Sequence, residues 1–427
     1  MIRARLRAAF EDFRGRGGGR TDVVCGLASL VDGGLDENLG LAPKSAAALK
    51  SRPVARLYNA GKGDPERVAI LCDFFPTTDD ATRNIVFVNQ FTSLSTSFIR
   101  YWDGPVVHVN PSLYAEYFGD APNLLVALLA AHLQPCVILN VSGSQAGKEN
   151  LRPEVLLDIR RKHGPAVVTF MNDLVTDFWR AQASIQMAAS DLVVSNDVSL
   201  GDTGLDLPPG RWIHLWHIID EDHYRHAGAA AQDGRDIGIG LYGRLSTHGF
   251  YRVHRLGLAN KLRAAGLPIH VRDATQESLL SYDDYLALLA RTRIRLSPSE
   301  AGLVGAFDRP LGTNPLVVRR HMNFTPWEAF MMGAMVLDSD DVTLPKFMRP
   351  GVEFVPYAGD ADLIDKARYY LREETERRQI VANARTAMRE RYSSAAYWTR
   401  IAERLQEAGN ERLAGAFRFD PPAGADA

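Results

Sequence analysis

Short runs of apolar residues recur through the first half of the chain, and most of them are continuous rather than alternating. Runs of strand length occupy residues 67–73, 84–90, 105–110, 135–141, 166–171 and 191–196. Continuous runs rich in Val and Ile are typical of parallel strands that are covered on both faces. Helical patterns at 123–133 and 152–164 separate several of them, and Pro153 and Gly164 mark the start and stop of the second helix. This alternation predicts a doubly wound α/β domain.

A second series of strands and helices begins at residue 236, after a stretch rich in Gly, Pro, Asp and Ala. Its predicted strands are 236–243, 268–273, 294–300 and 334–339, and its predicted helices are 251–266, 282–293, 326–333 and a region from 361 to about 408. Two such halves in tandem predict an α/β fold of two Rossmann-like domains. Their parallel sheets carry helices on both faces, and the domains face each other across a cleft.

The same pattern divides the chain into five parts. These are an N-terminal extension (1–62), a first Rossmann-like domain (63–215), a connection (216–235), a second Rossmann-like domain (236–395) and a C-terminal helix with a tail (396–427). Trp398, Ile401 and Leu405 form a single stripe on the last helix, which predicts a buried helix face.

Composition and charge exclude several classes of protein. The chain has 427 residues and a formal net charge of −2, so we expect no bulk attraction to nucleic acid. No apolar run is long enough to span a membrane, and the basic start lacks the apolar core of a secretory signal. At most, that start predicts peripheral membrane contact. Cys25, Cys72 and Cys136 lie far apart, which favours a reducing, cytoplasmic compartment.

The stretch IGIGLYGRLSTHGFYRVHR (237–255) is a candidate phosphate site. A strand runs into Gly243, which is followed by Arg244, Ser246 and Thr247 and then by a helix. The glycine lets a phosphate approach the backbone, and the helix N-terminus offers unpaired N–H groups. The arginine side chain matches two phosphate oxygens. The alternative is an ordinary turn with a Ser/Thr cap.

Glu328 opens a second candidate site, in the stretch NFTPWEAFMMGAMVLDS (323–339). This glutamate lies in the first turn of a short helix, close to Pro326. It is either a capping group or a hydrogen-bond acceptor for a vicinal diol such as ribose. Gly333, five residues further on, indicates that the helix passes close to another group, which favours the second interpretation.

Residues 236 to about 408 resemble the C-terminal half of a GT-B glycosyltransferase, in particular the spore-maturation-type, CgeB-like group. The resemblance rests on the order and spacing of several stretches. These are GLYGR at the first strand, LARTRIRLSPS (289–299), residues 323–339, residues 351–385 and RERYSSAAYWTRI (389–401). Residues 84–196 match by architecture, together with VVTFMND (167–173) and DLVVSND (191–197).

The resemblance implies a nucleotide-sugar donor bound by the second domain and an acceptor on the side of the first. It places the donor at Gly243, Arg244, Ser246, Thr247, Ser297, Ser299, Arg320, Asn323, Glu328 and Gly333. Glu328 would accept the ribose hydroxyls, and Gly243 and Arg244 would face the diphosphate. The last helices would pack back over the first domain. Two departures from the family pattern concern the contacts to the sugar. Arg320 stands where retaining relatives have a glutamate, and Thr325 stands where the family usually has an arginine.

No cofactor and no metal are expected, because GT-B enzymes stabilise the leaving diphosphate with cationic side chains and helix N-termini. An inverting reaction requires a base, for which Asp173 is the candidate after a strand end, with Asp79, Asp80 and His108 as rivals. A helix cap is the alternative role for Asp173.

The histidines at positions 214, 217, 223 and 226 have a spacing that zinc sites also show, but they lie in the connection. The sequence therefore leaves two hypotheses. The first is a metal-independent glycosyltransferase that acts on a hydroxyl of a glycan, lipid-linked or protein acceptor. The second is a non-catalytic nucleotide-sugar binder of the same fold.

Overall fold

The computed structural model describes most of the chain between residues 54 and 418, and the statements below concern only these residues. The described ranges are 54–59, 62–73, 85–118, 121–142, 151–171, 185–196, 209–221, 224, 234–243, 245, 250–273, 280, 282–303, 318–320, 324–339, 343–409 and 416–418. None of their helices is long and apolar enough to cross a membrane.

The first sheet has seven strands in the order β1-β3-β2-β4-β5-β6-β7. The strands are β1 (Ala55–Tyr58), β2 (Ala69–Cys72), β3 (Val106–Val109), β4 (Val137–Ser142), β5 (Ala166–Met171), β6 (Leu192–Ser195) and β7 (Trp212–His214). All neighbours are parallel except β1, which runs antiparallel to β3 at the edge. Five of the six runs predicted as strands in this half are confirmed as β2 to β6.

Helices cover both faces of this sheet. They are α5 (Ile85–Tyr101), α6 (Pro111–Phe118), α7 (Asn123–Leu133) and α8 (Pro153–His163), and the 3₁₀ turn η1 (Pro209–Arg211) precedes β7. α6, α7 and α8 share one apolar core with the sheet, and α5 lies in the core on the opposite face. Pro153 and Gly164 bound α8 as predicted, and Gly164 has the left-handed conformation (φ 70°) of a helix stop.

The prediction of a strand over 84–90 is wrong, because residues 85–90 begin α5. A short apolar run does not by itself distinguish a strand from a buried helix. The residues that follow this run favour a helix, since Leu94, Ser97 and Phe98 lie at helical spacing and are all buried. The Ser/Thr-rich stretch 91–98 is therefore the middle of a helix and does not follow a strand end.

The second sheet has five parallel strands in the order β14-β13-β10-β8-β9. They are β8 (Ile237–Gly243), β9 (Ile269–Asp273), β10 (Thr292–Ser297), β13 (Met335–Asp338) and β14 (Val355–Pro356), and β11 (Glu300–Leu303) pairs with β12 (Val318–Arg320) beside them. The helices are α12 (Phe250–Ala264), α13 (Tyr282–Ala290), α14 (Thr325–Met332), α15 (Gly359–Arg372), α16 (Glu374–Glu390) and α17 (Ser394–Glu407), with a 3₁₀ turn η2 (Leu344–Lys346).

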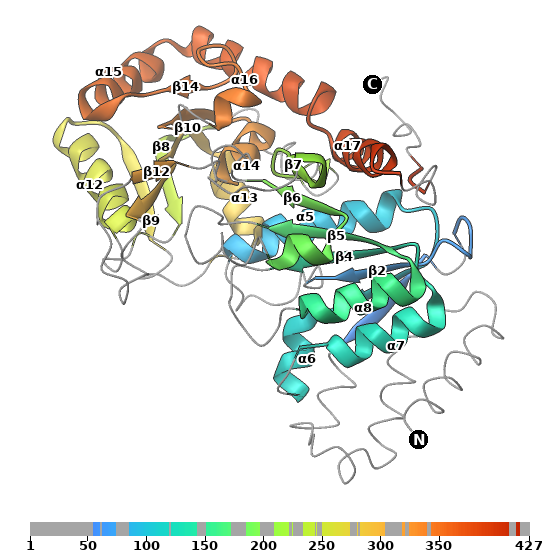
Figure 1. The fold of residues 1–427 in the computed structure, drawn as a ribbon. Coiled ribbons are helices and arrows are strands. Elements are labelled where there is room, and N and C mark those ends of the chain that lie inside the picture. The colour runs from blue at the N-terminus through green and yellow to red at the C-terminus, as the bar shows by residue number, and fades with distance from the viewer. Residues whose placement is uncertain are drawn as a thin grey trace.

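The predicted fold class is confirmed: the protein consists of two α/β units with parallel sheets and helices on both faces (Figure 1). In each unit the first parallel strand lies between the second and the third. These strands are β2, β3 and β4 in the first sheet and β8, β9 and β10 in the second. This order is that of a doubly wound fold, and it creates a topological switch point beside the first strand of each sheet.

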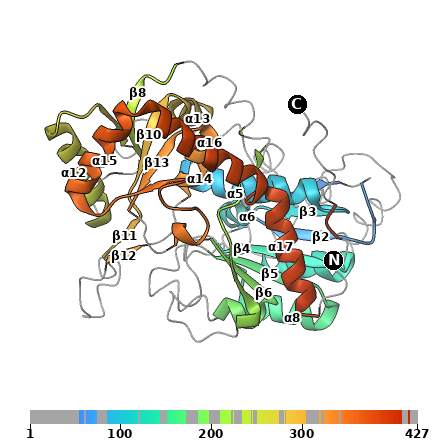
Figure 2. The ribbon, with the colours of Figure 1, turned by 90° about the horizontal axis from the view of Figure 1, so that it is seen from above.

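The last helix returns to the first unit, where α17 lies on α5 (Figure 2). The Trp398 indole N–H donates to the Ser97 hydroxyl at 3.0 Å, and its ring lies 5.1 Å from that of Phe98. Ile401 and Leu405, on the same stripe, are buried. Helix α17 thus packs on the first unit, as the resemblance to GT-B proteins implies.

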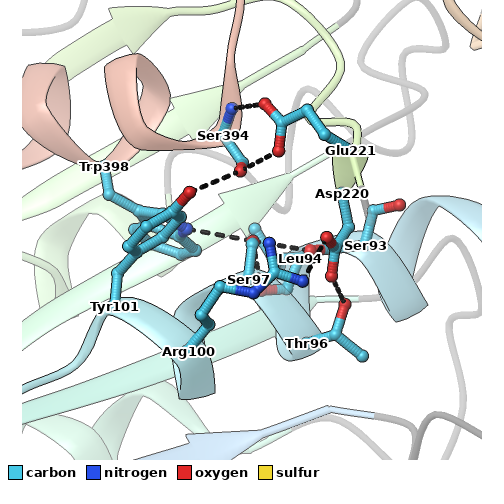
Figure 3. A network of polar contacts seen from close by, with 10 residues as sticks. All are labelled: Ser93, Leu94, Thr96, Ser97, Arg100, Tyr101, Asp220, Glu221, Ser394 and Trp398. Atoms are coloured by element: carbon cyan, nitrogen blue, oxygen red, sulfur yellow. Dashed lines mark hydrogen bonds and ion pairs between the residues drawn. The ribbon is translucent and has the colours of Figure 1, made fainter. Parts of the chain in front are cut away.

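Two adjacent acids of the connection join this contact (Figure 3). Asp220 pairs with Arg100 of α5 at 2.5 Å and accepts a hydrogen bond from the Thr96 hydroxyl. Glu221 accepts from both the backbone N–H and the hydroxyl of Ser394, the first residue of α17. A carboxylate at a helix N-terminus is favoured by the helix dipole, so the connection anchors both α5 and α17.

Replacement of Trp398 by Ala tests how much the returning helix contributes to stability. We expect the free energy of unfolding to fall by about 3–5 kcal/mol, because a large buried ring and its hydrogen bond to Ser97 are lost. Chemical denaturation followed by circular dichroism measures the change. Arg400→Ala, on the exposed side of the same helix, is the control, and equal effects of the two substitutions would contradict a role in packing.

The Glu221 carboxyl predicts a specific pH dependence. Burial raises its pKa above the ordinary value of 4.5, and this outweighs the hydrogen bonds from Ser394, which lower it. The folded protein therefore holds the proton more tightly than the unfolded chain. The resulting stabilisation is complete below the unfolded pKa and is lost as the pH rises through the folded pKa.

We expect the wild type to lose stability relative to Glu221→Gln as the pH rises from about 4 to 7, because Gln does not titrate. Urea denaturation at a series of pH values measures the difference between the two proteins. A wild type that instead gains stability over this range would show that the hydrogen bonds from Ser394 dominate over burial.

Candidate functional site

The carboxyl ends of the second sheet bring several of the predicted residues to one edge. Gly243 ends β8 and pairs in register with Asp273 at the end of β9. Ser297 ends β10 and pairs with Asp338 at the end of β13. The neighbours β8 and β10 form the switch point of this sheet, outside which ligands of open α/β folds bind. We take this carboxyl edge as the candidate site.

Gly243 has a backbone conformation that favours glycine, with φ of 136°. Among the described residues, a Cβ atom at this position would meet no heavy atom within 4 Å beyond its chain neighbours, so these residues leave the space beside the backbone open. Just beyond it, the Leu245 N–H donates to Asp273 Oδ1 at 2.9 Å, which ties the turn after β8 to the end of β9. The turn thus leaves room beside Gly243, and the hydrogen bond to Asp273 fixes it to the neighbouring strand β9.

Ser297 and Ser299 are buried and bind other residues of the edge. The Ser297 hydroxyl lies 3.4 Å from that of Thr325, the first residue of α14. Ser299 donates its hydroxyl to Asp338, and its backbone N–H donates to the Ser339 hydroxyl oxygen at 2.9 Å. The predicted pocket-lining serines therefore lie at the site, but their hydrogen bonds position α14 and the end of β13.

Glu328 lies one turn into α14 and is only 1% exposed. The hydroxyl of Tyr285, in α13, donates to its Oε2 at 2.9 Å. Burial and the charge of Glu328 both raise the pKa of Tyr285, so this phenol remains a donor throughout the physiological pH range. The carboxylate is therefore oriented by a fixed donor, which lies on a different helix.

A buried arginine accompanies this carboxylate. Arg295 of β10 donates to the carbonyls of Gly240 and Tyr242, at 3.1 and 2.9 Å, and its guanidinium lies 4.9 Å from the centre of the Tyr242 ring. Its positive charge acts on Tyr285 in the opposite sense to Glu328 and offsets part of the rise in the pKa of that tyrosine. Glu328 and Arg295 thus supply opposite charges around one phenol, beneath the carboxyl edge.

Gly333 does not lie at this edge, and its assignment to the donor site requires correction. It ends α14 with φ of 73°, and a Cβ there would come within 2.7 Å of Arg235 Nη2. Arg235 donates to the carbonyl of Thr292, at the start of β10, so Gly333 lies at the amino edge of the sheet. The group close to this glycine is a side chain of the protein itself.

The remaining predicted donor residues are only partly described. Arg320 is described through its backbone, which pairs with Glu300 between β12 and β11. Arg244, Ser246, Thr247, Asn323 and the candidate base Asp173 lie outside the described residues, as do its rivals Asp79 and Asp80. Their roles stay predictions.

The first sheet has its own switch point at β2, where sequence reasoning missed a residue. Asp73 follows β2 directly, is 1% exposed and accepts a hydrogen bond from the Ser95 hydroxyl of α5. His108, a rival for the base, is fully buried, and its Nε2 lies 3.1 Å from the Asp73 carbonyl oxygen. The signal for Asp73 was its place at the end of the run RVAILCD.

Tyr285 and Arg295 were also missed. An arginine inside the apolar run TRIRLS was the available signal for Arg295, because a buried strand contains a cation only where it is paired. No local signal identifies Tyr285, since its partner Glu328 lies 43 residues away in the chain.

Two of the four clustered histidines are described, and both pack against aromatic rings. His214 lies 5.0 Å from the ring of Phe347, and His217 lies 5.5 Å from that of Phe324. Within the described part of the chain, no group of three or more His, Cys, Asp or Glu residues is arranged to hold a metal ion. His223 and His226 lie outside that part.

Residues 251–403 match the model of a family described as Glycosyl transferase-like. The matched stretch contains Tyr285, Arg295 and Glu328 and ends within α17. The match therefore begins after β8 and covers the other four strands of the second sheet. No curated protein sequence matches the chain.

Several solved structures are similar in overall course at low sequence identity. The Anabaena protein HepE, in complex with UDP, is 13% identical over 80% of this chain and 100% of that chain, with a TM-score of 0.49. Sucrose-phosphate synthase from Thermosynechococcus elongatus is 10% identical with the same coverage and a TM-score of 0.49. A glycosyltransferase from Rickettsia africae is 10% identical over 80% of this chain and 98% of that chain, with a TM-score of 0.47.

Tyr285→Phe tests whether the phenol holds the buried carboxylate. We expect this substitution to lower the free energy of unfolding by about 1.5–3 kcal/mol, since it removes a hydrogen bond to a charged group and keeps the ring. Tyr369→Phe is the matched control, because that hydroxyl also donates to a carboxylate, Glu376, but at an exposed position. Equal effects in denaturation experiments would contradict a special role for Tyr285.

Proposed function

We propose that this protein is a glycosyltransferase that moves a sugar from a nucleoside-diphosphate donor to a hydroxyl group of an acceptor. The observation that carries the proposal is the position of Glu328. This buried carboxylate belongs to the glycosyltransferase-like segment and lies on the helix whose first residue contacts the end of β10. Tyr285 donates to it, and its helix borders β10, one of the two strands at the switch point outside which open α/β sheets bind ligands.

In this proposal Glu328 accepts hydrogen bonds from the ribose hydroxyls of the donor. A carboxylate fixed on one oxygen by Tyr285 is preorganised, so that little side-chain entropy is lost on binding. The diphosphate lies against the open space at Gly243, where the backbone conformation allows close approach. Arg244, Ser246 and Thr247 follow directly in the chain, and they would supply the cation and hydroxyl donors for the phosphate oxygens.

The chemistry requires stabilisation of the negative charge that develops on the leaving diphosphate. We propose that backbone N–H groups and arginine provide it without a metal ion, because preorganised donors in a dry site have effects of a few kcal/mol each. If the reaction inverts the anomeric carbon, Asp173 is the proposed base that takes the proton from the acceptor hydroxyl. Asp73, which accepts a hydrogen bond from Ser95, would hold α5 against the carboxyl edge of the first sheet.

Finer assignments follow from the resemblance and remain part of the proposal. They are membership of the spore-maturation-type group, a hexose as the transferred sugar and a glycan, lipid-linked or protein acceptor. We place the reaction in the cytoplasm, in the biosynthesis of cell-surface glycans, with at most peripheral membrane contact.

Glu328→Gln tests the ribose role. We expect the affinity for the matching nucleoside diphosphate to fall by about 1.5–3 kcal/mol, or roughly 10- to 100-fold, because a charged hydrogen-bond acceptor is lost. Isothermal titration calorimetry with a panel of nucleoside diphosphates measures this effect, and Glu390→Gln, at an exposed position, is the control. Unchanged affinity for every nucleotide would refute the assignment.

Turnover separates the enzyme from a non-catalytic binder. The nucleotide sugar that corresponds to the tightest diphosphate is incubated with the protein, and released nucleoside diphosphate is measured with and without candidate acceptors. Release that depends on Glu328 supports the transferase. Tight binding without release under any of these conditions supports the binder.

A further inference from the structure

Four arginines gather at the amino edge of the second sheet, at the opposite ends of its strands from the candidate site. Arg235 precedes β8, and its Nη1 donates to the Thr292 carbonyl at the start of β10, at 2.5 Å. Arg293, the next residue, donates from Nε to the Arg235 carbonyl at 2.8 Å. The other two, Arg377 and Arg385, belong to α16. We call these four residues the arginine cluster.

The geometry of α16 turns its two arginines toward Arg235. Val381 lies four residues from each of Arg377 and Arg385, so the three side chains share one helix face. A Cβ atom at Gly333 would lie 3.7 Å from Val381 Cγ1 and 2.7 Å from Arg235 Nη2. This helix face is therefore the one that packs against Arg235, with one arginine a turn before and one a turn after the contact.

Arg235 itself has a structural role. Its guanidinium donates to the carbonyls of Met332 and Thr292 and, at 3.5 Å, of Leu289, so it caps the last turns of α14 and α13. A cation at a helix C-terminus is favourable. Burial and, to a smaller extent, the charges of Arg385 and Arg377 together lower its pKa to about 10. Arg235 is thus a fixed positive charge beside the other three arginines of the cluster.

The other three arginines are short of carboxylates. Within the described residues, Arg377 lies 3.9 Å from Glu374, which is closer to Arg378, at 2.5 Å, and its Nη1 donates to the Tyr370 carbonyl at 2.7 Å. Among the residues that the structure describes, no carboxylate lies within 4.0 Å of Arg293 or Arg385. Each of these two side chains is half-buried. Like charges in a partly desolvated region repel one another, and a bound anion relieves that repulsion.

We propose that the arginine cluster is a binding site for phosphate groups. Guanidinium forks match the oxygens of a phosphate in pairs, and a doubly charged group balances several arginines at once. The phosphate belongs either to a free phosphorylated compound or to a lipid headgroup, which present the same chemistry. This site is separate from the proposed donor site. β10 and α14 both run between the two edges of the sheet, so the two sites lie at opposite ends of these elements. It is independent of the proposed function.

Titration of the full-length protein with sodium pyrophosphate at constant ionic strength tests the proposal, with the melting temperature as the readout. Arg385→Gln and the double variant Arg293→Gln/Arg385→Gln remove donors from the cluster. Arg389→Gln is the matched control on the same helix, since Arg389 is exposed and, among the described residues, donates only to the Thr386 hydroxyl. We expect the apparent dissociation constant to rise about tenfold on loss of Arg385 and to remain unchanged in the control.

A second arm uses vesicles of phosphatidylcholine with and without phosphatidic acid, in a cosedimentation assay. Binding that requires phosphatidic acid and is lost in the double variant identifies a lipid source, and a pyrophosphate response without vesicle binding identifies a free one. In phosphate-free buffer, Arg385→Gln should melt at or above the wild-type temperature, because repulsion is relieved. If the wild type binds neither probe, or if Arg385→Gln binds both as the wild type does, the proposal is refuted.

Discussion

A strand that is covered on both faces offers a ligand only the residues at its ends, and this constraint organises the second half of the molecule. Ile294 and Leu296 of β10 are completely buried, and so is Val336 of β13. A ligand can therefore reach polar groups of the sheet only at its two edges. The carboxyl edge carries the open backbone at Gly243 and the helix of Glu328, and the amino edge carries the arginine cluster. Both proposed sites follow from this separation.

Buried charges are the second feature that shapes the protein. Glu328 and Arg295 are almost inaccessible, and each is bound by groups of its own surroundings: a phenol for the carboxylate, and two strand carbonyls and an aromatic ring for the arginine. Removal of a charge from water is costly unless such partners are supplied. Their presence fixes α13 against α14 and β10, and it gives the carboxyl edge a rigid base on which a ligand can be oriented.

The two sheets are held together by segments that are distant in the chain. The connection supplies Asp220 and Glu221, and α17 supplies Trp398 and the N-terminal N–H groups of a helix. Asp220 binds α5 and Glu221 binds α17, so a change in the relative position of the sheets would have to alter this contact. Glu221 carries the pH dependence, since its burial opposes its ionisation.

The sequence by itself determined the local elements. Continuous Val/Ile runs identified the parallel strands, and Pro153 and Gly164 bounded a helix, because these signals act within a few residues. The exception, residues 84–90, has an apolar run too short to separate strand from helix. The position of Glu328 in the first turn of a helix, and of Gly243 at a strand end, also followed from local pattern.

Only the tertiary structure decided which residues meet. Tyr285 reaches Glu328 across 43 residues, and Asp73 meets Ser95 because α5 passes over the end of β2. Gly333 shows the limit most clearly. Its role as a helix stop was local, but the direction of α14 carries it to the amino edge, beside Arg235 rather than a ligand. Spacing along a chain fixes periodicity, whereas proximity depends on how the elements pack, and packing involves residues from every part of the sequence.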